Sequence, residues 1–171
     1  MNLLLLLASL TLAHADDALR GQILDLLSGV EEPATAADFA ALGEGVGTEL
    51  QAIARDADVL PTQRGNALVA LGQFPSDDAH SLLSGVLREN GGNKLLRRKA
   101  CTGLAVGFGD AAVPELVAVF AEGDTMMSTA VANALAMVGT PTAKLALQTQ
   151  QAIEKSGSVQ TAISTSIARI K

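Results

Sequence analysis

RGNALVALG, at residues 64–72, is the segment from which the architecture of this chain is best predicted. Its apolar residues follow helical spacing, and a glycine ends it, as glycine commonly ends helices. Two related segments occur later, TGLAVGFG at 102–109 and NALAMVG at 133–139. Leu68, Leu104 and Leu135 occupy equivalent places in the three segments. Their spacing falls within the period of about 20 to 50 residues that is typical of helical repeat proteins.

Amphipathic helical faces extend over the rest of the chain. The face of residues 79–87 follows the i, i+3, i+4, i+7, i+8 template completely, with Ala79, Leu82, Leu83, Val86 and Leu87. No stretch alternates apolar and polar residues over a convincing length, and aromatic residues make up only 2% of the chain. Strands favour aromatic and β-branched residues, so the composition disfavours a β-sandwich. We therefore expect an all-α fold.

Helix caps can be predicted at several breaks between these faces. Ser76 and Thr125 are candidate N-caps, and Thr140 is another, with Pro141 at the first helical position. Asp110 is predicted to cap the helix that follows it.

Taken together, these segments resemble the HEAT repeat family, in particular its short bacterial form, whose first helix reads R-x-x-A-x-x-A-L-G. The matching pairs are 64–72 with 78–87, 97–108 with 110–121, and 127–139 with 141–153, and 159–171 would be half a repeat. The third pair lacks the arginine. The resemblance covers roughly residues 36–171 and implies a right-handed α-solenoid of about four repeats, in which neighbours stack on one another. The same faces also permit a globular helical bundle.

Two further expectations come from this resemblance alone. HEAT repeats often pair an Asp with an Arg six residues later, and only Asp58 and Arg64 keep that spacing here. The second helices of such repeats usually line the concave surface. In this chain that set would be 62–73, 94–106, 126–138 and 159–170.

The first fifteen residues have the pattern of a secretory signal peptide. An apolar run is followed by Ala13-His14-Ala15, an A-x-A cleavage site, although no Lys or Arg precedes the run. The run is too short to span a bilayer, which needs about 20 residues. We predict cleavage after Ala15 and a secreted or periplasmic mature domain over 16–171. The alternative is a buried N-terminal helix.

The charge is distributed unevenly along the chain. The net charge is −6, and residues 16–93 hold 13 acidic and 4 basic residues, whereas 94–171 hold 5 acidic and 8 basic ones. Lys94, Arg97 and Arg98 share a helical face by their spacing. They are the candidate partner-binding residues, for an acidic peptide or another anionic partner. The alternative is a solvated rim. The acidic balance and the lack of an aromatic platform argue against nucleic acid.

No catalytic constellation is recognisable in the sequence. Cys101 lies within a predicted helix, where a cysteine usually packs as a small hydrophobe, although an intermolecular disulfide remains an alternative. His80 is expected to be a solvated histidine near carboxylates. The acidic pairs 16–17, 31–32, 56/58 and 77–78 fit loops and first helical turns better than a catalytic or metal site. We expect no enzyme activity, no cofactor and no metal.

Three functions fit these observations. The first is an exported scaffold that binds a protein or peptide through its solenoid surface. The second is an accessory protein of an enzyme or of a cofactor-attachment system. The third is a purely structural envelope component. The identity of the partner and the oligomeric state stay open.

Overall fold

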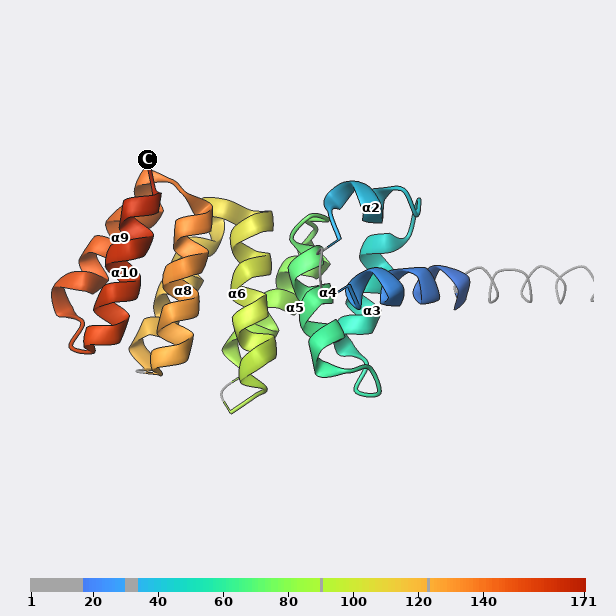
Figure 1. Cartoon of the computed structure of the whole chain (residues 1–171), viewed down its shortest axis with the longest axis horizontal. Helices are drawn as coiled ribbons and strands as arrows, with labels where there is room; N and C mark the ends of the chain where they lie inside the picture. The colour runs from blue at the N-terminus through green and yellow to red at the C-terminus, as the bar shows by residue number, and fades with distance from the viewer. Residues whose placement is uncertain (1–16, 30–33, 90, 123) are drawn as a thin grey trace, which may run out of the picture. The chain divides into compact units, whose positions relative to one another are not determined.

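The computed structural model describes residues 17–29, 34–89, 91–122 and 124–171, and within these ranges it contains helices and no strand (Figure 1). The prediction of an all-α fold is therefore confirmed. The predicted signal peptide, residues 1–15, lies outside the described residues. The chain divides into two compact units, Met1–Ala67 and Leu68–Lys171.

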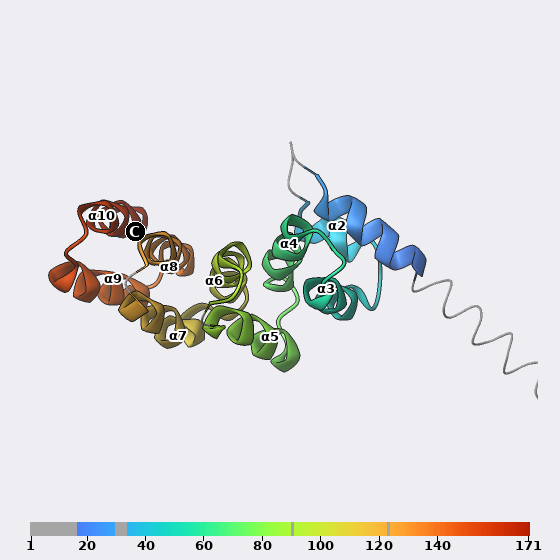
Figure 2. The ribbon, with the colours of Figure 1, turned by 90° about the horizontal axis from the view of Figure 1, so that it is seen from below.

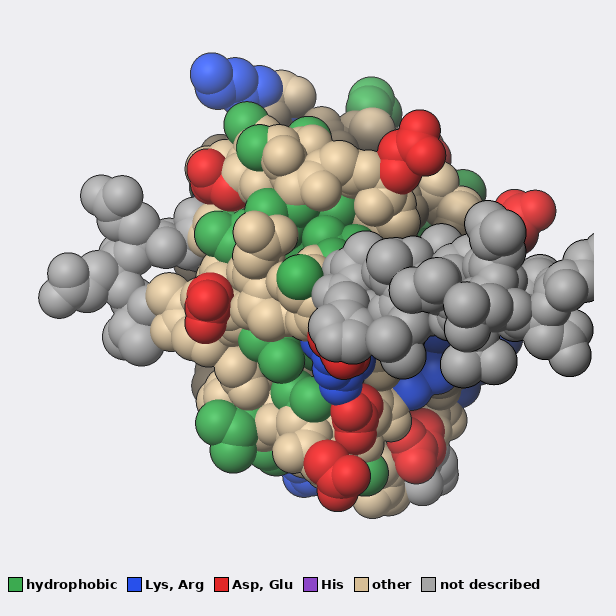
Figure 3. Space-filling model, turned by 90° about the vertical axis from the view of Figure 1, so that its right-hand side faces the viewer, with side chains coloured by type: hydrophobic (Ala, Val, Ile, Leu, Met, Phe, Trp, Pro, Cys, Tyr) green, Lys and Arg blue, Asp and Glu red, His purple; other side chains and the backbone are tan. Residues whose placement is uncertain are grey.

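The first unit holds the helical residues 17–27, α2 (Ala36–Ala40), α3 (Val46–Arg55) and the first part of α4 (Pro61–Leu71). Its core is formed by fully buried aliphatic residues and one phenylalanine, among them Ile23, Phe39, Leu50 and Ile53. Arg20 binds Glu49 at 2.7 Å and also pairs with Asp56, so the helix at 17–27 is fastened to α3. Figure 3 shows acidic side chains spread over the visible face of the molecule, in keeping with the acidic N-terminal sequence.

The second unit begins with the end of α4. It continues through α5 (Asp77–Arg88), α6 (Lys94–Phe108), the 3-10 turn η1 (Gly109–Ala112), α7 (Val113–Ala118), the 3-10 turn η2 (Val119–Glu122), α8 (Thr125–Val138), α9 (Pro141–Ile153) and α10 (Gly157–Arg169). Helix α6 packs against α5 and α8, and α8 packs against α10. Figure 2 shows α6, α8 and α10 in one row and α5, α7 and α9 in a second row. Within this unit the fold thus has two layers of helices.

Burial repeats along the chain with almost the same period as the sequence. Four positions in α4, Ala67, Leu68, Ala70 and Leu71, are buried, and so are the four corresponding positions in α6 and in α8. The later sets are Ala100, Cys101, Gly103 and Leu104, and then Val131, Ala132, Ala134 and Leu135. In this register Leu71 corresponds to Leu104 and Leu135, so the equivalence of Leu68 with these two leucines predicted from the sequence is wrong. In the other helices of the pairs, the fully buried leucines Leu50, Leu83, Leu116 and Leu147 follow one another at nearly equal intervals. Successive helix pairs therefore bury positions with nearly the same spacing.

Small residues let the end of α4 approach α6 closely. A Cβ atom on Gly103 would lie 2.3 Å from the carbonyl oxygen of Leu68, and one on Gly72 would lie 2.6 Å from the carbonyl oxygen of Gly103. Real Cβ atoms do not come so near to backbone oxygens. The glycine that ends RGNALVALG is consequently a packing residue as well as a helix terminator.

The predicted helix caps are partly confirmed. The Ser76 hydroxyl accepts from the Ala79 amide, and the Thr140 hydroxyl accepts from the Ala143 amide, with Pro141 opening α9. Two predictions are wrong. Asp124 rather than Thr125 caps α8, and Asp110 lies in η1, where its carboxylate accepts from the hydroxyl of Thr140. The 3-10 turn separates Asp110 from the start of α7, so its side chain bonds to the next helix pair instead.

One helical run, Lys94–Glu122, is 29 residues long and apolar enough to cross a membrane by length and composition. It is not one straight helix, because α6 and α7 lie in different rows and the chain turns at η1 between them (Figure 2). Leu96, Leu104 and Leu116 of this run are buried inside the fold. Core helices of water-soluble proteins meet the same two criteria, so the run is weak evidence for a membrane span.

Candidate functional site

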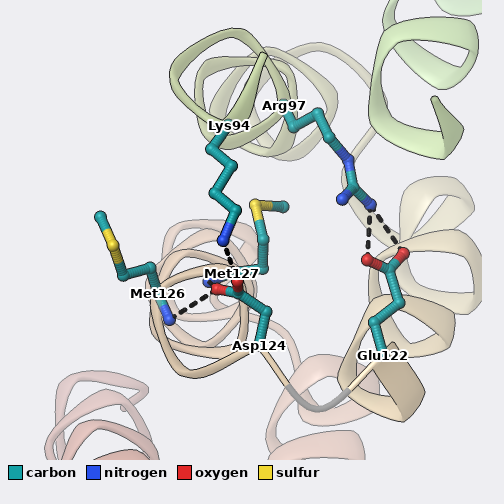
Figure 4. A network of polar contacts seen from close by, with 6 residues as sticks. All are labelled: Lys94, Arg97, Glu122, Asp124, Met126 and Met127. Carbon is teal, nitrogen blue, oxygen red and sulfur yellow. Dashed lines mark hydrogen bonds and ion pairs between the residues drawn. The ribbon is translucent and has the colours of Figure 1, made fainter. Parts of the chain in front are cut away.

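The three basic residues predicted to bind a partner lie in the first two turns of α6 (Figure 4). The helix begins there because the Asn93 side chain caps it, accepting from the amides of Leu95 at 2.9 Å and Leu96 at 3.4 Å. The structure nevertheless gives Lys94, Arg97 and Arg98 three different environments.

Arg97 is buried, with 5% of its surface exposed, so the expectation of an exposed charge at this position is wrong. Its Nε donates to the carbonyl oxygen of Leu87 at 2.8 Å, and its Nη2 donates to both carboxylate oxygens of Glu122 at 2.6 and 2.7 Å (Figure 4). Charge-assisted bonds of this length are strong, and both partners belong to the same chain. Arg97 therefore joins the end of α5 to η2 and is not available to a ligand.

Arg64 occupies the position that corresponds to Arg97 in the previous repeat. Its Nε donates to the carbonyl oxygen of Ala54 at 3.1 Å, and Ala54 precedes it by ten residues, as Leu87 precedes Arg97. Both carbonyls lie in the last turn of a helix, where backbone oxygens lack intrahelical partners. Among the ion pairs of the described residues, none joins Asp58 to Arg64, although these two residues keep the Asp–Arg spacing of the HEAT pattern. The arginine of the motif caps the preceding helix instead.

Lys94 is exposed and pairs with Asp124 at 2.5 Å. The other oxygen of Asp124 accepts from the amides of Met126 and Met127, each at 3.0 Å, at the start of α8 (Figure 4). The bond from Lys94 and the bonds from these two amides hold the pKa of Asp124 below its ordinary value. The charge of Lys94 is thus largely compensated within the chain.

Arg98 differs from Lys94 and Arg97. It is half-buried, and its guanidinium group forms no hydrogen bond or ion pair among the described residues. Its Nε is shielded from solvent and has no acceptor there. Arg98 lines a groove of about 300 Å³ between α6 and α8. Other lining residues are Leu95, Lys99, Met126, Thr129 and Asn133, and no acidic residue lines the groove.

A second polar cluster joins α5 to α7 around Glu115, a residue that the sequence analysis did not single out. The Glu115 carboxylate lies 2.9 Å from Nε2 of His80, accepts from the Ser84 hydroxyl at 2.6 Å and pairs with Arg88 at 3.3 Å. The ring of His80 also meets Phe108 edge-on, with ring centroids 4.7 Å apart. His80 is therefore half-buried and bonded rather than simply solvated.

The Glu115 cluster does not have the geometry of a hydrolase triad. In a triad a histidine accepts the proton of the serine hydroxyl and is held by the acid on its other side. Here the Ser84 hydroxyl and His80 both contact the carboxylate, and His80 does not accept the hydroxyl proton of Ser84 as the histidine of a triad does. The cluster instead connects neighbouring helix pairs. This cluster is hard to recognise in the sequence, because His80 and Glu115 are 35 residues apart.

The other candidate groups show no chemical activation. Cys101 is fully buried, and burial raises the pKa of its thiol to about 12, which confirms it as a packing residue. Of the acidic pairs, 56/58 and 77–78 are described, whereas the 31–32 pair and residue 16 lie outside the described residues. Within the described part of the chain, no three or more His, Cys, Asp or Glu residues lie close enough together to hold a metal ion.

Comparison of the chain with models of protein families finds no match. Comparison with curated protein sequences finds no significant match either. The function therefore has to be argued from the fold and the surface alone.

Proposed function

We propose that this chain is an exported, non-enzymatic interaction module, built as a HEAT-like solenoid, that binds a protein or peptide partner. The burial pattern that recurs from one helix pair to the next supports the solenoid, as does the arginine bond that recurs between α3 and α4 and between α5 and α6. Nearest-neighbour stacking gives such proteins extended binding surfaces. The pattern at residues 1–15 is the ground for export.

The observation that carries the binding proposal is the surface of α6 and α8. Val106, Met126 and Met137 are about half exposed there, at 46%, 52% and 47%. Methionine side chains adapt their shape to different partners and are common on protein-binding surfaces. On the other row, α9 exposes Leu145 at 64% and Ile153 at 68% but carries no methionine. The exposed methionines therefore make the row of α6, α8 and α10 the proposed binding face.

The charge reversal of Arg97 together with Arg98 is not a suitable test, because Arg97 is part of the fold. Photo-crosslinking is more direct. A benzoylphenylalanine residue is placed at Met137 on α8 or, as a matched control, at exposed Gln148 on α9 of the other row. The protein is then irradiated in its native host. We expect a discrete crosslinked partner from position 137 and none from position 148.

Two results would contradict the proposal. Crosslinks from position 148 alone would place the partner on the other row, and the absence of crosslinks from both positions would favour the structural role. The export part has its own test. Intact-mass analysis should show a mature chain that begins at Asp16, and retention of Met1 would contradict export.

A further inference from the structure

The groove between α6 and α8 contains an arginine whose bonding is incomplete within the chain. The guanidinium group carries five N–H donors and no acceptor, so every partner has to be an acceptor. The Nε of Arg98 is screened from water and has no such partner. A donor left in this state is unfavourable in the free protein, and a ligand oxygen would relieve it.

The two carboxylates that bind the other basic residues at the start of α6 are already engaged. Glu122 is held by Nη2 of Arg97, and Asp124 is held by Lys94 and by two amides of α8 (Figure 4). The groove itself has no acidic lining residue. Within the described part of the chain, the groove thus offers Arg98 no anionic acceptor, and a carboxylate of another molecule would supply one.

The rest of the groove limits what that molecule can be. Leu95, Met126 and Ala130 give it an apolar part, and Thr102, Thr129 and Asn133 give it neutral polar groups. Its volume of about 300 Å³ lies at the lower end of the range for small ligand pockets. That space suits one or two side chains of an extended peptide, one apolar and one anionic.

We propose that this groove binds a peptide segment in which an Asp or Glu side chain lies next to an apolar side chain. The carboxylate accepts from the guanidinium of Arg98, and the apolar side chain packs between Leu95 and Met126. This inference rests on the proposed function and names the chemistry of its partner. Of the three candidate basic residues, it assigns the contact with the anion to Arg98 and not to Lys94 or Arg97.

The inference can be tested by NMR titration of the full mature protein with two blocked peptides, acetyl-Leu-Glu-Leu-amide and acetyl-Leu-Gln-Leu-amide. We expect the acidic peptide to shift the amide signals of Thr102, Thr129 and Asn133, and to bind at least about tenfold more tightly than the neutral one. Arg98→Gln should remove this preference. Arg88→Gln changes an exposed arginine on α5 and should keep it.

Several outcomes would overturn the inference. These are equal affinities for the two peptides, an unchanged preference in Arg98→Gln, or equal shifts with inorganic phosphate, which would indicate a general anion site. The amide spectrum of each variant reports directly whether it is folded. Arg98→Lys should restore part of the affinity, because a lysine keeps the charge but not the planar donor set.

Failure of this inference can be distinguished from failure of the proposed function. If position 137 still crosslinks to a partner in the Arg98→Gln background, the binding face stands and the groove assignment is wrong. If the acidic peptide binds through Arg98 but position 137 yields no crosslink, the groove stands and the partner-binding role is contradicted.

Discussion

The side chain of Arg97 donates hydrogen bonds to three acceptor atoms, which are the Leu87 carbonyl oxygen and both carboxylate oxygens of Glu122. Arg97→Met keeps most of the apolar stem but leaves these acceptors without their donor. We expect a loss of about 2–3 kcal/mol of unfolding free energy, below the ~3–5 kcal/mol typical of a broken buried pair, because Glu122 is partly in contact with water. Urea denaturation measures the change.

The neighbouring residue provides the control for this substitution. Arg98→Met removes an arginine from the next position of the same helix without breaking any bond that the described structure contains. Its unfolding free energy should stay within about 0.5 kcal/mol of the wild type. Equal losses in the two variants would show that the Arg97 contacts do not stabilise the fold.

Cys101 should be unreactive in the folded protein. Its thiol is buried with a pKa of about 12, so at pH 8 hardly any thiolate is present and no reagent can reach the sulfur. Because the folded pKa is raised above the ordinary value of 9.0, this thiol favours the folded state fully below pH 9 and progressively less from pH 9 to 12. A thiol-disulfide reagent should label Cys101 only in denaturant. Fast labelling of the native protein would contradict the packed position.

Cys101 and Arg97 show what a single sequence can reveal about individual side chains. Cys101 lies among small apolar residues at core spacing, so its burial could be predicted. Arg97 shares a helical face with two other cations, and spacing gives the direction of a side chain but not its depth. Its buried position depends on Glu122, 25 residues later, and on the backbone carbonyl of Leu87. A backbone carbonyl is present at every residue, so the sequence does not mark it as a partner.

At the level of helices, the contact between α4 and α6 depends on glycine. Gly103→Ala would place a Cβ 2.3 Å from the Leu68 carbonyl oxygen and 2.9 Å from Cδ2 of Leu83. Because a backbone oxygen cannot rotate away, the helices would have to separate, and we expect a loss of about 1–3 kcal/mol. Thermal denaturation followed by circular dichroism tests this.

Gly85 in α5 is the matched control, since a Cβ added there would meet no atom within 4 Å. Gly85→Ala should raise stability by about 0.5–1 kcal/mol, because alanine loses less backbone entropy in a helix. If both alanine variants were stabilised, the close approach of α4 and α6 would be disproved.

Helix positions were predictable where a local signal exists. The interval predicted as 94–106 is observed as α6, Lys94–Phe108, and the interval predicted as 126–138 is observed as α8, Thr125–Val138. Asp110 failed as a cap because η1, a 3-10 turn, follows α6 directly. Nothing in the local sequence marks the difference between a 3-10 turn and a loop at that point.

At the scale of the whole molecule, α10 closes the C-terminal end of the second unit. It packs against α8 and α9, with Val159, Ile163 and Ile170 buried, and Lys144 of α9 donates to the Ile170 carbonyl oxygen at 3.0 Å. Deleting residues 156–171 should expose the faces of α8 and α9 to water, lower the melting temperature and promote aggregation. Calorimetry and size-exclusion chromatography measure these effects.

Deletion of Lys171 alone is the control, because this residue is exposed at the end of the chain. It should leave both the melting temperature and the elution volume unchanged. An unaltered melting temperature after loss of the whole helix would mean that α10 contributes nothing to the unit.

The class of the whole fold follows from helical periodicity and composition, and so does the approximate period of the repeat. The groove around Arg98 could not be predicted, since it is formed by residues of α6 and α8 that are distant from one another in the sequence. Its character depends on the absence of an acidic neighbour in space. The sequence alone does not show this absence, because two acidic residues, Glu122 and Asp124, stand directly before α8.

The arginine bond that spans ten residues has a consequence for how such a chain can change in length. The segment 77–109 contains both the donor Arg97 and its acceptor at Leu87, so an in-frame duplication of this segment would copy a complete junction. An insertion of one or two residues inside a helix would rotate the buried face out of register. Unequal recombination could therefore lengthen this protein in whole modules, whereas small insertions would be confined to the turns between helices.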